Sequence, residues 1–84
     1  MKQIKLIALS DKGEEALLKD LYKNKKFFVM VIDRQKPLVL KLYPKPFIVR
    51  RLGFDDLEYS IKKTLKKLEV FENIDYSIEV LNDE

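Results

Sequence analysis

The apolar run from Phe27 to Ile32 constrains the fold more than any other segment of the chain. It is rich in residues that favour strands, and apolar side chains occupy both faces of the strand that it predicts. In a two-layer domain, one face of a sheet meets the helices and the other faces water. The second apolar face is therefore expected to contact a second copy of the chain or a partner protein, unless the carboxy-terminal strand or the proline-rich hairpin covers it.

The remaining patterns predict a small α+β domain with the element order β-α-β-β-β-α-β. We expect a mixed sheet with both helices packed on one of its faces. The predicted strands are residues 2–9, 27–32, 38–42, 47–51 and 75–81, and helices are predicted to begin at Asp11 and at Asp55. The whole of residues 1–84 is expected to form one domain, because a chain of this length is too short for two.

The second helix has the clearest signal. Its apolar residues recur at spacings of four, four and three, which places them on one face of a helix: Leu57, Ile61, Leu65 and Leu68. Asp55 is predicted to cap the first turn and Glu58 to complete a capping box. In the first helix, Asp11 and Glu14 are predicted to have the same roles. These acidic residues are therefore interpreted as structural, and neither group is expected to bind a metal.

The chain contains no cysteine, histidine or tryptophan. The first two absences exclude disulfides, thiol chemistry, Cys/His zinc sites and Ser–His or Cys–His nucleophiles. With only two glycines, the chain also has no glycine-rich loop that could hold a phosphate group. We therefore predict no catalytic residues, no metal and no cofactor, and expect a protein that is not an enzyme.

Hydropathy and composition indicate where in the cell, and in what kind of organism, the protein is expected. No apolar run approaches the roughly 18 residues that a membrane helix needs, and the amino terminus lacks the pattern of a secretory signal. We therefore expect a cytoplasmic protein without a membrane partner. The abundance of Lys, Glu and Ile, with few Asn and Gln, is typical of proteins from a thermophile.

Charge is distributed unevenly along the chain. The net charge is +3, but residues 19–67 carry fourteen Lys and Arg against five Asp and Glu, a net charge of +9. Residues 68–84, which include the predicted strand 75–81, carry six acids and no base. A basic body with an acidic end favours binding of polyanions or pairing between two copies of the chain.

The middle of the chain resembles a known family. Pro37 opens an extended segment, a hairpin follows at residues 43–46, and Gly53 leads into the last helix, as in the carboxy-terminal half of thioredoxin-like domains. Residues 36–58 are most similar to KaiB and the glutaredoxins. The redox motif of that family is replaced by residues 10–13, which contain no thiol. The resemblance therefore implies a thioredoxin-like domain without redox cysteines, a type that commonly binds other proteins.

A ferredoxin-like sandwich, β-α-β-β-α-β, is the alternative to the thioredoxin-like fold. In that arrangement residues 38–51 form one bent strand, and the short connection at residues 33–37 is a hairpin. Both folds place two helices on one face of the sheet.

The segment between residues 34 and 54 contains six cations and no acid, interleaved with aromatic residues. We therefore predict that the partner-binding surface is formed by Tyr43, Lys45, Phe47, Arg50 and Arg51. Adjacent arginines in a strand would point to opposite faces of the sheet. The leading hypothesis is a protein-interaction module or a small accessory or regulatory subunit that binds a partner or forms a homodimer. The alternative is a small basic nucleic-acid-binding protein, because cations and aromatic rings are also typical of nucleic-acid surfaces.

Overall fold

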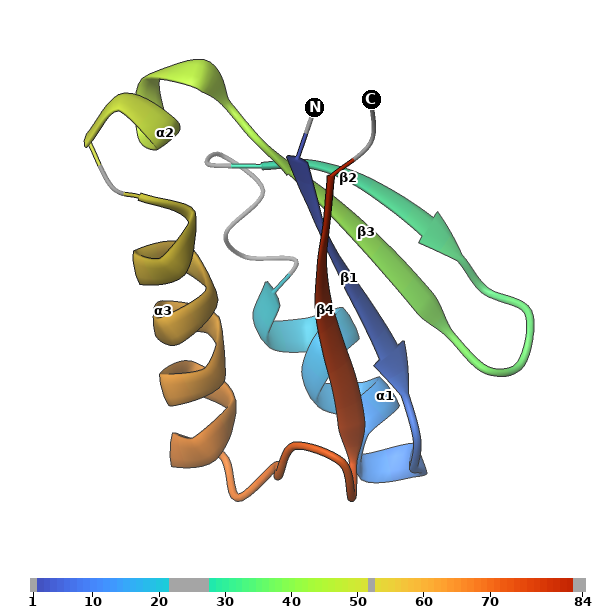
Figure 1. Cartoon of the computed structure of the whole chain (residues 1–84). Helices are drawn as coiled ribbons and strands as arrows, with labels where there is room; N and C mark the ends of the chain where they lie inside the picture. Colours follow the sequence, from blue (N-terminus) through green and yellow to red (C-terminus); the bar gives the residue numbers. More distant parts are fainter. Residues whose placement is uncertain (1, 22–27, 52, 83–84) are drawn as a thin grey trace.

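The computed structural model describes residues 2–21, 28–51 and 53–82 (Figure 1). The elements in chain order are β1 (Lys2–Ala8), α1 (Asp11–Ala16), η1 (Leu17–Leu21), β2 (Phe28–Asp33), β3 (Val39–Pro44), α2 (Pro46–Arg51), α3 (Phe54–Lys67) and β4 (Tyr76–Asn82). The chain is thus a small α+β domain. Phe27, with which the predicted second strand begins, lies outside the described residues.

The four strands form one antiparallel sheet in the order β2-β3-β1-β4. Each helical connection joins two strands that have a third strand between them: β3 lies between β1 and β2, and β1 lies between β3 and β4. The turn between β2 and β3 contains a cis Lys36–Pro37 peptide bond. The prediction of a mixed sheet was wrong, because all three pairs of neighbouring strands are antiparallel. The predicted strand at residues 47–51 was also wrong, because this segment belongs to the helix α2.

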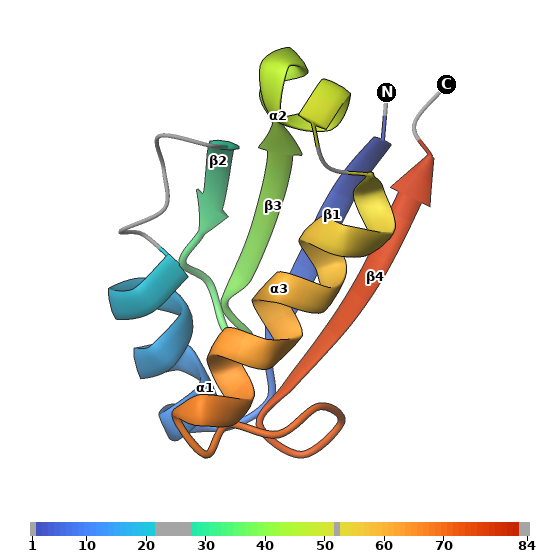
Figure 2. The same cartoon turned by 90° about the vertical axis from the view of Figure 1, so that its left-hand side faces the viewer.

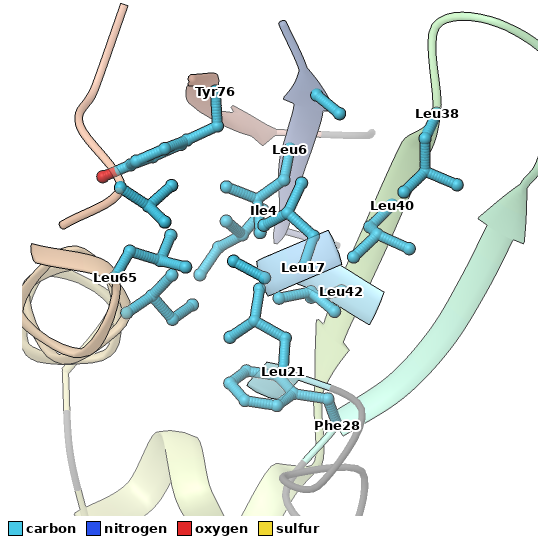
Figure 3. Packing of buried hydrophobic residues seen from close by; sticks show 14 of the residues in the cluster. Ile4, Leu6, Leu17, Leu21, Phe28, Leu38, Leu40, Leu42, Leu65 and Tyr76 are labelled. Atoms are coloured by element: carbon cyan, nitrogen blue, oxygen red, sulfur yellow. The ribbon is translucent and has the colours of Figure 1, made fainter. Parts of the chain in front are cut away.

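The core lies between the sheet and the helices, which all pack on one face (Figures 1 and 2). Ile4 of β1 is paired with Leu42 of β3, and Leu6 with Leu40, so these four side chains point to the same side of the sheet. All four are fully buried and meet side chains from the helical layer, including Leu17, Leu21 and Leu65 (Figure 3). The alternation along each strand thus sends one apolar set inwards and leaves the other face of the sheet without a helix.

The helix α3 buries the predicted apolar stripe against this core. Leu57, Ile61 and Leu65 are buried, whereas Leu68 is 39% exposed because it lies at the end of the helix. The predicted cap at Asp55 was wrong: Gly53 occupies the N-cap position without a side-chain hydrogen bond, and Asp55 lies in the first turn. An acid at that position interacts favourably with the positive end of the helix dipole.

A hydrogen-bonded latch joins the start of α1 to the chain just before β4. Ser10, not Asp11, caps α1: its Oγ accepts a hydrogen bond from the Gly13 amide at 3.0 Å. The same hydroxyl donates to Asp75 Oδ1 at 2.7 Å, and Asp75 Oδ2 accepts from the Phe71 amide at 3.0 Å. A Cβ atom on Gly13 would lie 1.9 Å from the Asp75 carbonyl oxygen, so only glycine fits at this position.

The end of α3 has the hydrogen-bond pattern of a Schellman motif. The Val70 amide donates to the Leu65 carbonyl and the Glu69 amide to the Lys66 carbonyl, each at 3.0 Å. Glu69 has a φ of 60° at the position where glycine is usual, and Asn73 in the following loop has a φ of 66°. The loop thus contains two left-handed residues that are not glycine.

The latch predicts acid-sensitive stability. The pKa of Asp75 is lowered because the Phe71 amide and then the Ser10 hydroxyl donate hydrogen bonds to its carboxylate. Its contribution to stability is therefore present above the ordinary aspartate pKa and is lost as the pH falls through the lower folded value. We expect Asp75→Asn to be less stable near neutrality and to lose less stability below about pH 4. Urea unfolding from pH 7 to pH 2 measures this. Glu79→Gln, at an exposed position, is the control. If the free energy of unfolding changed equally with pH in Asp75→Asn and in the native chain, the latch would be contradicted.

Replacement of Glu69 by glycine should stabilise the fold. Glycine adopts the left-handed conformation without the Cβ penalty, so Glu69→Gly is expected to raise the free energy of unfolding by about 1 kcal/mol. Asn73→Gly is the matched control and should gain less, because asparagine tolerates this conformation better than glutamate. Thermal and urea unfolding of the two variants provide the measurement. A destabilised Glu69→Gly variant would show that the glutamate side chain contributes more than its backbone conformation costs.

Candidate functional site

The short helix α2 holds three of the predicted site residues, Phe47, Arg50 and Arg51. Tyr43 lies near the end of β3, and Lys45 joins the two elements. Pro46 is the first residue of α2, where its fixed φ suits a helix and its missing N–H has no intrahelical partner to lose. The Lys45 carbonyl accepts hydrogen bonds from the Ile48 amide at 3.0 Å and the Val49 amide at 3.3 Å. Ile48 is buried in the core and anchors the helix. The predicted hairpin at residues 43–46 was therefore wrong, because β3 ends at Pro44 and the helix α2 begins at Pro46.

The helical geometry changes how the cations are displayed. Phe47, Arg50 and Arg51 are separated by three and four residues, so they share one face of α2. All three are exposed, Phe47 by 53%. The expectation that the two arginines point to opposite faces was therefore wrong. Neither arginine forms a salt bridge with a carboxylate in the described part of the chain.

A groove of about 680 Å³ lies between α2 and the nearby ends of β2, β3 and α3. Its lining consists of Val29, Tyr43, Pro44, Lys45, Pro46, Val49 and Phe54. We call this lining, together with Phe47, Arg50 and Arg51 on α2, the basic groove. Its volume is within the range of pockets that hold ligands, about 300–1,000 Å³. Tyr43 and Lys45 thus line the groove directly, whereas the other three predicted residues lie on the helix that forms part of its wall.

Five lining residues were not predicted as site residues: Val29, Pro44, Pro46, Val49 and Phe54. For Val29, the sequence did contain an indication, because the strand β2 has apolar side chains on both faces. On the face away from the helices, Val29 is 56% and Val31 51% exposed. The carboxy-terminal strand β4 does not cover them, because it forms the opposite edge of the sheet from β2. The second apolar face of β2 is therefore continuous with the basic groove through Val29.

The charge of the basic groove is positive. No acid occurs between residues 34 and 54. The flanking acids are Asp33 at the end of β2 and, in the first turn of α3, Asp55 and Asp56. Lys45 is the one cation among the described residues that line the groove. Arg50 and Arg51 add positive charge on the neighbouring exposed face of α2. The arrangement suits a ligand with apolar groups and negative charge.

Two features are absent from the described residues: a group of side chains that could hold a metal ion and a helix that could cross a bilayer. Within residues 2–21, 28–51 and 53–82, no three His, Cys, Asp or Glu side chains are grouped so that they could hold a metal ion. In the same ranges, no helix has the length and apolar character needed to cross a bilayer. The groove itself contains no carboxylate, only the Tyr43 hydroxyl and the Lys45 ammonium as ionisable groups.

Comparisons with known proteins find no relative of this chain. No protein-family model matches it, and neither a curated protein nor a solved structure matches it.

The two neighbouring residues at the start of α2 should respond differently to substitution. Ile48→Ala leaves a cavity under the helix and is expected to lower the free energy of unfolding by about 2–4 kcal/mol. Phe47→Ser removes a side chain that is mainly exposed and should change stability by less than about 0.5 kcal/mol. Urea unfolding of both variants checks this. A large loss of stability in Phe47→Ser would mean that this ring packs within the domain and is not available to a partner.

Proposed function

We propose that this chain is a non-enzymatic protein-interaction module, and that the basic groove binds an acidic segment of a protein that also carries apolar side chains. The observation that carries the proposal is the apolar groove itself, whose lining includes the exposed Val29 and Val49 together with Lys45. The exposed Phe47, Arg50 and Arg51 lie on the neighbouring face of α2. Exposed apolar groups grouped in this way are typical of an interaction site. The cations add charge complementarity, which speeds association and selects the partner.

The distribution of cations favours a protein over a nucleic acid as the ligand. Nucleic-acid binding needs positive charge that follows the phosphate backbone and rings on which bases can stack. Here Arg50 and Arg51 are confined to one short helix, and the groove walls are largely valine and proline. Phe54 packs partly against the core. These features support an apolar peptide segment as the occupant and make an oligonucleotide the alternative outcome of the test.

The strand order supports the ferredoxin-like alternative for the fold, because both β-α-β connections span an intervening strand. The thioredoxin-like resemblance and the cytoplasmic location stay predictions. The proposed function depends on neither of them, because it is argued from the groove.

The proposal predicts selective binding of an acidic amphipathic peptide. A labelled synthetic peptide that alternates Glu with Leu and Phe should bind the native chain, and its affinity should fall with added salt. A peptide with Lys in place of Glu should not bind. Arg50→Glu/Arg51→Glu should weaken binding by about tenfold or more, because like charges then face each other. Fluorescence anisotropy measures each affinity.

The matched control is Lys63→Glu/Lys66→Glu, which makes the same change in charge on exposed positions of α3. It should bind the peptide almost as the native chain does. Tighter binding of a single-stranded oligonucleotide than of the acidic peptide would contradict the proposal and favour a nucleic-acid-binding protein. Equal loss of binding in both charge variants would show that net charge, and not the groove, attracts the peptide.

A further inference from the structure

The loop between α3 and β4 exposes apolar and acidic side chains together. We call residues 68–75 the acidic loop. Ile74 is 69% exposed, Phe71 45% and Leu68 39%. Glu69 and Glu72 lie between these residues, and no Lys or Arg occurs from residue 68 to residue 84. The acidic loop therefore has the composition that the basic groove is proposed to bind.

The acidic loop is held in a defined shape. The Ile74 amide donates to the Phe71 carbonyl at 3.2 Å, and the Asn73 amide donates to the Tyr76 carbonyl. The Asp75 carboxylate accepts from the Phe71 amide and is held by Ser10 of the α1 cap. The exposed side chains of Phe71 and Ile74 are thus presented on an ordered backbone. Preorganisation of this kind lowers the entropic cost of binding.

The acidic loop and the basic groove lie at opposite ends of the molecule. Phe54, the first residue of α3, lines the groove together with residues of α2. Figures 1 and 2 show that α2 lies near the amino-terminal end of α3, and that the loop follows its carboxy-terminal end. The 14 residues of α3 separate them by about 21 Å of helix. Two complementary surfaces at distant places on one molecule produce a head-to-tail contact between copies.

We infer that the basic groove receives the acidic loop of a second copy of this chain, with Phe71 and Ile74 against the apolar lining and Glu69 near the arginines of α2. This inference rests on the proposed function of the groove and names one occupant for it. Glu69 is exposed and has no salt bridge within the described residues. Glu72 is already paired with Lys62 at 3.3 Å, so Glu69 is the acid available to a second copy.

Symmetric contacts are less favourable. A groove-to-groove dimer brings the α2 arginines of two copies together, and a loop-to-loop dimer brings the acids together. A dimer through the open face of the sheet would bury Lys5 and Lys41, which lie directly opposite each other on β1 and β3. Like charges in that position destabilise each other, and burial adds a desolvation cost. Lys5 also lies opposite Glu79 of β4, so the open face carries charges of both signs. The head-to-tail contact joins a basic surface to an acidic one.

Two variants test the contact. The groove variant is Arg50→Glu/Arg51→Glu, and the loop variant is Glu69→Lys/Ile74→Ser; all four positions are exposed. We expect the mean mass of the native chain to rise from one chain towards two or more between micromolar and millimolar concentration. Each variant alone should keep the mass of one chain. Sedimentation equilibrium gives these masses, and Lys63→Glu/Lys66→Glu should assemble as the native chain does.

An equimolar mixture of the two variants provides the decisive result. The loop variant keeps an intact groove and the groove variant keeps an intact loop, so a head-to-tail contact predicts a complex of two chains that does not grow further. A mixture that stays monomeric, or a native chain that stays monomeric at millimolar concentration, overturns the inference. The loop variant is then titrated with the acidic peptide. Binding of the peptide leaves the proposed function standing while self-association fails, and absence of binding overturns both.

Discussion

The structure depends on the burial of one face of a four-stranded sheet beneath two helical segments. Ile4, Leu6, Leu40 and Leu42 form the floor of the core, and the helical layer covers them (Figure 3). The helices within the described residues all lie on this side of the sheet. The opposite face of the sheet, including the apolar side chains of β2, is left to solvent or to a partner. The exposed part of the basic groove follows from this constraint.

The helix α3 connects the two surfaces that carry the functional proposals. Its buried stripe of Leu57, Ile61 and Leu65 attaches it to the core. Its amino-terminal end lies beside the basic groove, and its carboxy-terminal end leads into the acidic loop. Lys62 of α3 links the helix to that loop through its ion pair with Glu72, and it also pairs with Glu58 within the helix. The uneven charge along the sequence thereby becomes a separation of charge between two ends of the folded molecule.

Much of the fold was predictable where periodicity was strong. The four observed strands and the stripe of α3 follow patterns that local sequence displays directly. The caps were less predictable, because Ser10 and Gly53 take positions that Asp11 and Asp55 also suit on composition. The segment after Pro46 was misinterpreted as a strand. Residues 47–51 have a preference for strands, but such a preference depends strongly on context. In the structure they form a helix that buries Ile48 in the core, and this packing overrides the local preference.

The sequence by itself determined the composition of the binding surface: a cationic, aromatic segment without acids, and a chain without thiols or imidazoles. It also determined that β2 has apolar side chains on both faces. Only the tertiary structure decided that Arg50 and Arg51 share one exposed helix face, and that Val29 from another strand completes the groove. The reason is physical. Local spacing specifies which residues can share a face of one element, whereas a groove is made where separate elements pack against a common core.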